Sequence, residues 1–100
     1  MDLITKDQQA GWNALERLLK VARQDTGQAR RVANFLLAWH NAEESGGWDP
    51  VDLWSVDVAI ADDMLTVVRL IRESHRYPDG LGFGEEITAV WQLWRNKTTT

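Results

Sequence analysis

Three side chains near the middle of the chain have the spacing of metal ligands, provided that the segment is helical. His40, Glu43 and Glu44 stand at positions i, i+3 and i+4, which places an imidazole and two carboxylates within reach of one another on one helical face. A carboxylate-bridged di-iron site needs Glu-x-x-His from two helices plus two further glutamates, whereas here the order is reversed and occurs once. We therefore expect a solvated or self-paired helix end, with no metal and no other cofactor.

Other arrangements that could support catalysis are equally incomplete. Asp62 and Asp63 are adjacent, so on a helix they point about 100° apart, and no third acid follows at a usable offset. One of the two is expected to face solvent. His75 lies near a predicted helix end, where a histidine commonly serves as a cation. The glycine-rich "GLGFG" lacks the preceding strand of a phosphate loop, and no serine nucleophile has a plausible base. We therefore expect a protein that is not an enzyme.

A stretch of residues 46–57, "GGWDPVDLWSVD", combines two tryptophans with three aspartates. Trp48 and Trp54 bracket a predicted short helix that also carries Asp49 and Asp52. An indole beside acidic residues at a helix start is typical of a protein-contact patch, where buried aromatic side chains dominate affinity. An alternative holds for Trp48, which could instead be a hydrophobic staple that packs across to Leu53 and seals one end of a helical bundle.

The charge of the chain is distributed unevenly. The net charge is -4 and the isoelectric point about 5.0, which argues against a dedicated nucleic-acid binder because phosphate contacts need a basic face. No lysine or arginine occurs between Arg31 and Arg69. That segment carries a charge of -7 and the rest of the chain +3. The seven acids of the segment are Glu43, Glu44, Asp49, Asp52, Asp57, Asp62 and Asp63.

Two rows of basic residues are compatible with phosphate contacts, but a solvated helix face that pairs with neighbouring carboxylates is the more common role of such rows. We therefore expect no direct binding of nucleic acid. The rows are Arg17, Lys20 and Arg23, and Arg69, Arg72 and Arg76.

Length and composition indicate one domain. One hundred residues, 44% of them hydrophobic, can close a single core without disulfides, and the chain has no cysteine. No segment approaches the ~20 apolar residues of a membrane span, and the amino-terminal residues do not read as a signal peptide. We expect a soluble cytoplasmic protein of 100 residues in which about residues 6–95 are ordered and the last residues are frayed.

Hydrophobic periodicity predicts helices throughout. A Thr5–Gln8 capping box opens a helix over about residues 6–24, and a second helix ends at the glycines of "SGG", residues 45–47. A short helix begins at Asp49 and Pro50, and Ser55 or Asp57 caps a longer helix that ends near Ser74. Residues 75–84 are expected to form an ordered loop or turn pair, and a last helix follows. The predicted fold is all-α, a compact bundle of four main helices plus one short helix.

Four tryptophans fall on the apolar stripes of these predicted helices, and we expect at least three of them to pack in the core. They are Trp12, Trp39, Trp91 and Trp94. The apolar stripe of the longer helix that is predicted to end near Ser74 comprises Val56, Ile60, Met64, Val67, Val68 and Ile71.

The stretches "DTGQARRVANFLLAWHNAEESGGWDPVDLWSVDVAIADDML" and "YPDGLGFG" resemble a small uncharacterised proteobacterial family found in accessory and mobile-element DNA. The resemblance covers roughly Leu15–Arg95. It implies no activity and carries over no catalytic residue.

The chain is also similar in general character to the anti-CRISPR proteins of phages, particularly those that act against type I-F systems. The shared features are a stand-alone, acidic, helical protein and the lack of an enzymatic motif. Many such inhibitors occupy basic DNA-binding channels, and an acidic segment would favour that encounter. The likeness implies an inhibitor whose partner is a protein with a basic groove, such as a Cas surveillance complex. We expect a monomer or homodimer that contacts neither nucleic acid nor membrane.

Two alternatives remain open. One is a regulatory or structural domain that self-associates through its tryptophans. The other is a domain whose acidic segment only keeps the protein soluble. The expected partner-binding residues are Glu43, Glu44, Trp48, Asp49, Asp52, Trp54, Asp57, Asp62 and Asp63.

Overall fold

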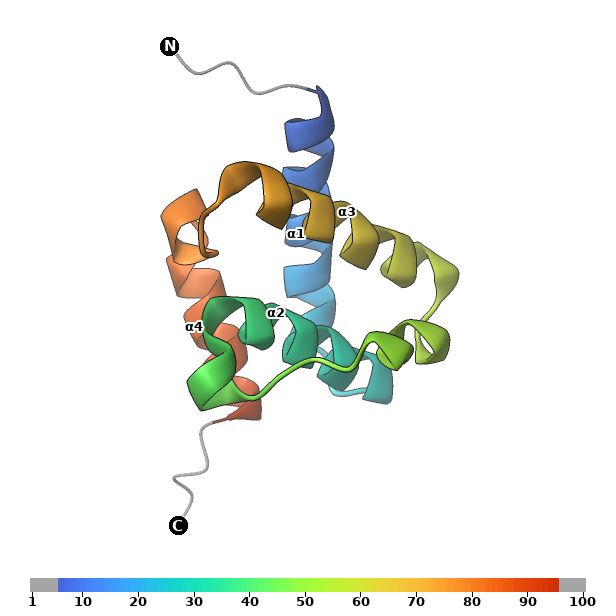
Figure 1. Cartoon of the computed structure of the whole chain (residues 1–100). Helices are drawn as coiled ribbons and strands as arrows, with labels where there is room; N and C mark the ends of the chain where they lie inside the picture. Colours follow the sequence, from blue (N-terminus) through green and yellow to red (C-terminus); the bar gives the residue numbers. More distant parts are fainter. Residues whose placement is uncertain (1–5, 96–100) are drawn as a thin grey trace.

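Helices make up the regular structure of the chain. The computed structural model describes residues 6–95, and within that range it contains no strand. The elements are α1 (Lys6–Ala22), α2 (Gly27–Ser45), the 3-10 helix η1 (Pro50–Ser55), α3 (Val58–Ser74), the 3-10 helix η2 (Asp79–Leu81) and α4 (Gly84–Trp94) (Figure 1). The predicted all-α fold with four main helices is confirmed.

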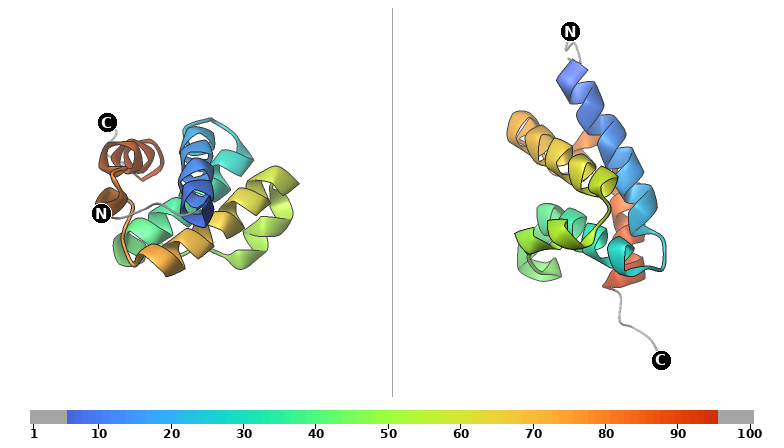
Figure 2. Two further views of the ribbon diagram at one scale, coloured as in Figure 1. Left: turned by 90° about the horizontal axis from the view of Figure 1, so that it is seen from above. Right: turned by 90° about the vertical axis from the view of Figure 1, so that its right-hand side faces the viewer.

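The helices run in two main directions: α1 and α4 lie roughly along one, and α2 and α3 lie roughly along the other (Figure 1; Figure 2). α2 and α3 both run across α1, and α4 packs against the carboxyl half of α2 (Figure 1; Figure 2). η1 lies between the start of α2 and the start of α3, and η2 packs against α4. Residues 46–55, which follow α2, therefore run back along the molecule from the carboxyl end of α2 to its amino end (Figure 1).

The core lies where the four helices meet, and the helical periodicity explains which residues enter it. α2 buries Phe35 and Leu37 in addition to one apolar stripe because it contacts neighbours on more than one side. The buried apolar residues of α1 are Ala14, Leu15, Leu18, Leu19 and Ala22, and the buried stripe of α2 comprises Ala29, Val32, Ala33 and Leu36. In α3 the predicted stripe is wrong at one position: Val68 is 40% exposed, and Leu70 is buried instead. The largest fully buried side chains are Leu15, Leu18, Leu19, Val32, Leu36, Leu37, Met64, Val67, Pro78, Ile87 and Val90.

A glycine lets α1 and α3 approach closely. A Cβ atom added at Gly11 would lie 2.9 Å from the Cβ of Leu70, which is too close for any side chain. The absence of a Cβ at Gly11 therefore sets how near the two helices lie.

The helix ends agree with the sequence in most places. The Thr26 hydroxyl accepts a hydrogen bond of 2.9 Å from the Ala29 amide and caps α2. α1 ends at Ala22, two residues before the predicted end. The predicted Thr5–Gln8 capping box and the predicted frayed tail of residues 96–100 lie outside the described residues.

The loop of residues 75–84 contains a short regular element that we did not predict. The amides of Leu81 and Phe83 both donate to the Pro78 carbonyl, which tightens the chain into η2. Leu81 and Phe83 are buried as a result, and the Phe83 ring meets Trp12 edge-on at 5.5 Å between centroids. The segment thus closes one side of the core.

The four tryptophans on the predicted stripes pack against the core, as expected, but all four are only partly buried and lie at its margin. Two of them also bind distant backbone. The Trp94 Nε1 donates to the Ala22 carbonyl at 2.6 Å, and the Trp39 Nε1 donates to the Arg76 carbonyl at 3.0 Å. These bonds tie α4 to the end of α1, and α2 to the segment after α3.

Candidate protein-contact surface

The short helix η1 presents apolar side chains on two sides. The Asp49 side chain caps η1 by accepting a hydrogen bond of 3.1 Å from the Val51 amide, and Pro50 occupies the first position. In a 3-10 helix, residues three apart lie on the same side. Val51 and Trp54, which are three residues apart, share the outer side, whereas Leu53 lies on another side and packs against the core.

Trp54 is the most exposed large hydrophobic residue in the described part of the chain. Its side chain is 84% exposed, and Val51, three residues earlier, is 41% exposed. Val58, the first residue of α3, is 77% exposed. We call these three residues, Val51, Trp54 and Val58, the Trp54 surface.

Trp48 has a different environment from Trp54. It packs edge-on against Phe35, with 4.9 Å between ring centroids, and belongs to the hydrophobic side chains that cover the core. Its indole nitrogen is buried and has no hydrogen-bond partner within residues 6–95. Trp48 thus covers the core, in agreement with its interpretation as a seal at one end of the bundle, and the aromatic ring that it meets is Phe35 of α2.

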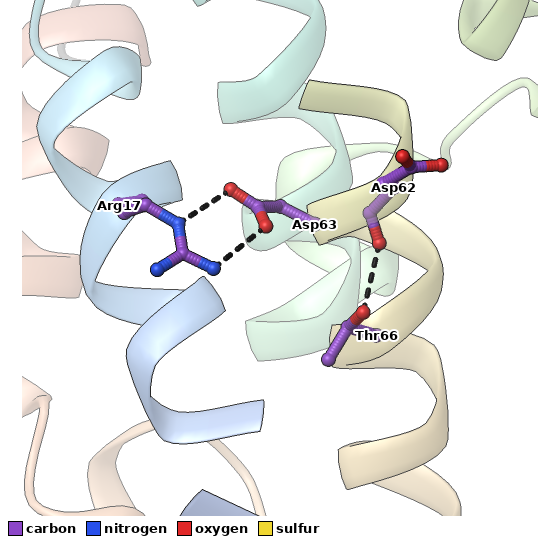
Figure 3. Close-up of polar contacts among 4 residues, drawn as sticks. All are labelled: Arg17, Asp62, Asp63 and Thr66. Atoms are coloured by element: carbon purple, nitrogen blue, oxygen red, sulfur yellow. Dashed lines mark hydrogen bonds and ion pairs between the residues drawn. The ribbon is translucent and has the colours of Figure 1, made fainter. Parts of the chain in front are cut away.

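Several of the expected contact acids are engaged within the molecule. Asp63 accepts two hydrogen bonds of 2.9 Å from the Nε and Nη2 atoms of Arg17 (Figure 3). Asp52 lies 3.8 Å from the Nε of Arg31, the distance of a weak ion pair. The hydrogen bonding of Asp63, first, and then its charge raise the pKa of the Arg17 guanidinium above its ordinary value.

Asp57 and Asp49 are engaged by neutral groups. The Asp57 amide donates to the side-chain oxygen of Gln28, and the Gln28 amide donates to the Asp57 carboxylate at 3.3 Å. Asp49 caps η1, as described above. Both aspartates nevertheless remain exposed to solvent.

Three of the acids have no internal partner within the described part of the chain, and they do not lie together. The Asp62 carboxylate points away from α1, and its main-chain oxygen accepts a hydrogen bond of 2.9 Å from Thr66 (Figure 3). Glu43 and Glu44 lie at the carboxyl end of α2, beside α4. Glu43 follows Arg31, the α2 residue that approaches Asp52 of η1, by 12 residues, or roughly 18 Å of helix. The expected contact residues therefore occupy two regions.

The region around His40 holds a pocket but no metal-ligand cluster. The pocket has a volume of about 260 Å³ and is lined by His40, Asn41, Glu44, Ser45, Thr88 and Trp91. Glu43 lines a neighbouring hollow instead. α2 departs from helical geometry at Asn41, with φ -166° and ψ 85°, so the i, i+3, i+4 spacing no longer defines one face. Among the described residues, no three His, Asp or Glu side chains are grouped to hold a metal ion.

Sequence reasoning missed the valines of the Trp54 surface. Val51 precedes Trp54 by three residues. This spacing places the two on the same side only if the short helix is a 3-10 helix. Val58 lies opposite the stripe of Met64 and Val67 on α3, so helical periodicity could have placed it outside.

The molecule is thus a small all-α protein with an exposed, tryptophan-centred surface. The chain belongs to a family of unknown function (DUF7673), whose model matches residues 12–95. The predicted membership of an uncharacterised family is confirmed, and it assigns no active residue. No curated protein and no solved structure matches the chain. None of the helices in residues 6–95 is long and apolar enough to cross a membrane.

Proposed function

We propose that the protein is a non-enzymatic interaction protein that binds another protein through the Trp54 surface. The observation that supports this proposal is the contrast among the tryptophans. Five of the six are packed against the core, whereas Trp54 is 84% exposed and contributes little to folding. Single exposed apolar side chains are common, but an exposed indole with exposed valines three residues before it and four residues after it in the sequence has the composition of an interface centre.

Burial of Trp54 by a partner would provide substantial binding energy. An aromatic side chain buries about 150–250 Å² at an interface. At about 25 cal/mol per Å², that area corresponds to roughly 4–6 kcal/mol before the costs of association are subtracted. A tryptophan of this kind is expected to act mainly on the dissociation rate of the complex.

The charges around the Trp54 surface favour a basic partner. Asp49 precedes η1 and Asp57 follows it, and both are exposed. Because four of the seven acids in the segment have internal partners, the remaining field is weaker than the charge of -7 alone implies. In this proposal, charge complementarity therefore raises the association rate and selects the partner, and the apolar contact provides most of the binding free energy.

The partner that we propose to test first is a type I-F CRISPR surveillance complex. The support for it is the likeness of class described above and the acidic character of residues 32–68, which suits a basic DNA-binding channel. In this proposal the protein is an anti-CRISPR inhibitor that blocks target DNA by occupying the channel. Self-association through tryptophans is a weaker alternative, since Trp54 is the one indole that is not packed against the core.

A competition assay tests both the partner and the surface. Purified type I-F surveillance complex is mixed with labelled target DNA and increasing amounts of the protein. We expect DNA binding to be lost with the parent and to need at least about 10-fold more of Trp54→Ala, since an interface hot spot is worth about 1.4 kcal/mol or more.

Leu93→Ala is the matched control, because Leu93 is a 55% exposed apolar residue on α4. It should inhibit as the parent does. DNA binding that is unaffected by the parent protein would overturn the proposed partner, and equal inhibition by Trp54→Ala would overturn the proposed surface.

A further inference from the structure

The outer face of α3 has the residue spacing of a helix–helix interface. Val58, Asp62, Leu65, Arg69 and Arg72 follow one another at steps of four, three, four and three residues, and all five are exposed. This is the spacing of the seam between two coiled helices. The opposite face of α3, with Met64, Val67 and Leu70, is buried in the core.

The centre of this face is apolar. Leu65 is 54% exposed and Val68, beside it, is 40% exposed, so two large apolar side chains stand at the middle of the helix without cover from residues 8–95. Together with Val58 they make α3 the helix that exposes the most large apolar side chains among the described ones.

Charges of opposite sign lie on either side of Leu65. Asp62 precedes it by one turn, and Arg69 follows it by one turn. Neither side chain has a hydrogen bond or an ion pair with another side chain in the described part of the chain, in contrast to Asp63, which is held by Arg17. Arg72 approaches only Glu73, at 3.8 Å, and is 78% exposed.

We propose that a second copy of this chain covers the face, with the two α3 helices antiparallel about a twofold axis near Leu65. In that arrangement Leu65 of each copy meets Leu65 of the other. Asp62 of each copy meets Arg69 of the other, and the twofold axis makes this ion pair twice. A parallel arrangement would place like charges together, which is destabilising, so the charges select the antiparallel one.

The dimer leaves Val51 and Trp54 free, whereas Val58 belongs both to the Trp54 surface and to the end of the α3 face. Leu65 lies about 10 Å along α3 from Val58, and the antiparallel arrangement places the two copies of η1 at opposite ends of the interface. The dimer therefore does not rest on the proposed function. The face from Val58 to Arg72 is about 21 Å long and, at the roughly 10 Å width of a helix, covers about 200 Å². This area is well below the ~800 Å² per partner of stable complexes, so we expect a weak dimer that forms only at high protein concentration.

Sedimentation equilibrium on the full chain, from about 10 μM to about 1 mM, tests the proposal. The parent should approach the mass of a dimer, and Leu65→Glu and Asp62→Arg should remain monomeric because each places an unpaired charge in the interface. The double variant Asp62→Arg/Arg69→Asp should dimerise again, because it restores both ion pairs with their signs exchanged. A merely structural role of these residues would not produce that rescue.

Two controls keep the outcomes distinct. Leu93→Glu adds the same charge on α4 and should dimerise as the parent does, and circular dichroism should show that every variant is folded. A parent that is monomeric over the whole range would overturn the proposal, as would a double variant that stays monomeric. Loss of the dimer in Trp54→Ala alone would overturn the α3 interface in favour of a tryptophan interface.

Discussion

Arg17 and Asp63 join α1 to α3 through two hydrogen bonds of 2.9 Å between side chains that are 46 positions apart in the sequence. The adjacent acid, Asp62, points away from α1 (Figure 3). Two neighbouring aspartates therefore have different roles: Asp63 helps to hold the fold, and Asp62 is available at the surface. The distinction divides the acidic segment into structural and exposed members.

Removal of the Asp63 charge should destabilise the fold, whereas removal of the Asp62 charge should not. The Arg17 side chain is 60% exposed, so solvent screens the pair and Asp63→Asn should lower the free energy of unfolding by about 0.5–1 kcal/mol. Asp62→Asn, the matched control, should change it by less than about 0.3 kcal/mol. Urea denaturation measures both, and equal values for the two variants would contradict the assignment.

The pair also predicts how this difference depends on pH. Because the pKa of Arg17 is raised in the folded state, its contribution to stability is fully present below the ordinary arginine pKa and is lost only as pH rises through the raised value. The difference between the parent and Asp63→Asn should therefore be constant from about pH 6 to about pH 10. Urea denaturation at intervals across that range checks it, and a steady decline of the difference would show that another group titrates with the pair.

Gly11→Ala should destabilise the protein although alanine favours helices. The added Cβ would lie 2.9 Å from the Leu70 Cβ and would force α1 and α3 apart. We expect a loss of about 1–3 kcal/mol, after a gain of up to about 1 kcal/mol in helix propensity. Gly84→Ala in α4 is the control, since its nearest atom lies at 3.5 Å, and it should be neutral or slightly stabilising in thermal denaturation. A stabilised Gly11→Ala would refute the close approach of the helices.

The two kinds of tryptophan should separate in stability measurements. Trp39→Ala loses a partly buried indole and its hydrogen bond to the Arg76 carbonyl, so we expect a cost of about 2–4 kcal/mol. Trp54→Ala should cost less than about 0.5 kcal/mol because its indole contributes little to the core. Chemical denaturation of both variants decides the matter, and a Trp54 cost as large as that of Trp39 would move Trp54 from the surface into the core.

Arg95 should be sensitive even to a conservative change. Its guanidinium donates to the Ser45 carbonyl at 2.8 Å and to the Asn34 side-chain oxygen at 2.6 Å, and so ties the end of α4 to α2. Lysine cannot reproduce this fork of donors, and Arg95→Lys should cost about 1–2 kcal/mol. Arg72→Lys, at a 78% exposed side chain, is the control and should be neutral in the same denaturation experiment. A neutral Arg95→Lys would show that these bonds are replaced by water.

Most of the fold could be predicted because its determinants are local. The glycines after Ser45, and Asp49 with Pro50, mark helix ends through contacts within a few residues, so the sequence predicts these ends correctly. The capping of α2 by Thr26 emerges only from the structure. The stripe of α3 was read less well, because whether Val68 or Leu70 is buried depends on the direction from which α1 crosses that helix. That direction depends on Gly11, more than 50 positions earlier in the sequence.

The candidate surface could be predicted only in part. The stretch around Trp54 was identified from composition, but composition cannot distinguish an acid that faces solvent from one that is bound by a distant residue. Asp63 and Asp57 meet Arg17 and Gln28, which lie far away in the sequence, so their roles follow from the tertiary fold. The kink at Asn41 likewise could not be foreseen from the helical periodicity of α2.

The most direct measurement is the dissociation rate of the type I-F surveillance complex from the immobilised protein, compared between the parent, Trp54→Ala and Leu93→Ala. We predict that Trp54→Ala dissociates at least about 10-fold faster than the parent and that Leu93→Ala dissociates at the parent rate. Binding of the complex with equal dissociation rates for all three would contradict the Trp54 surface, and no binding by the parent would contradict the proposed partner.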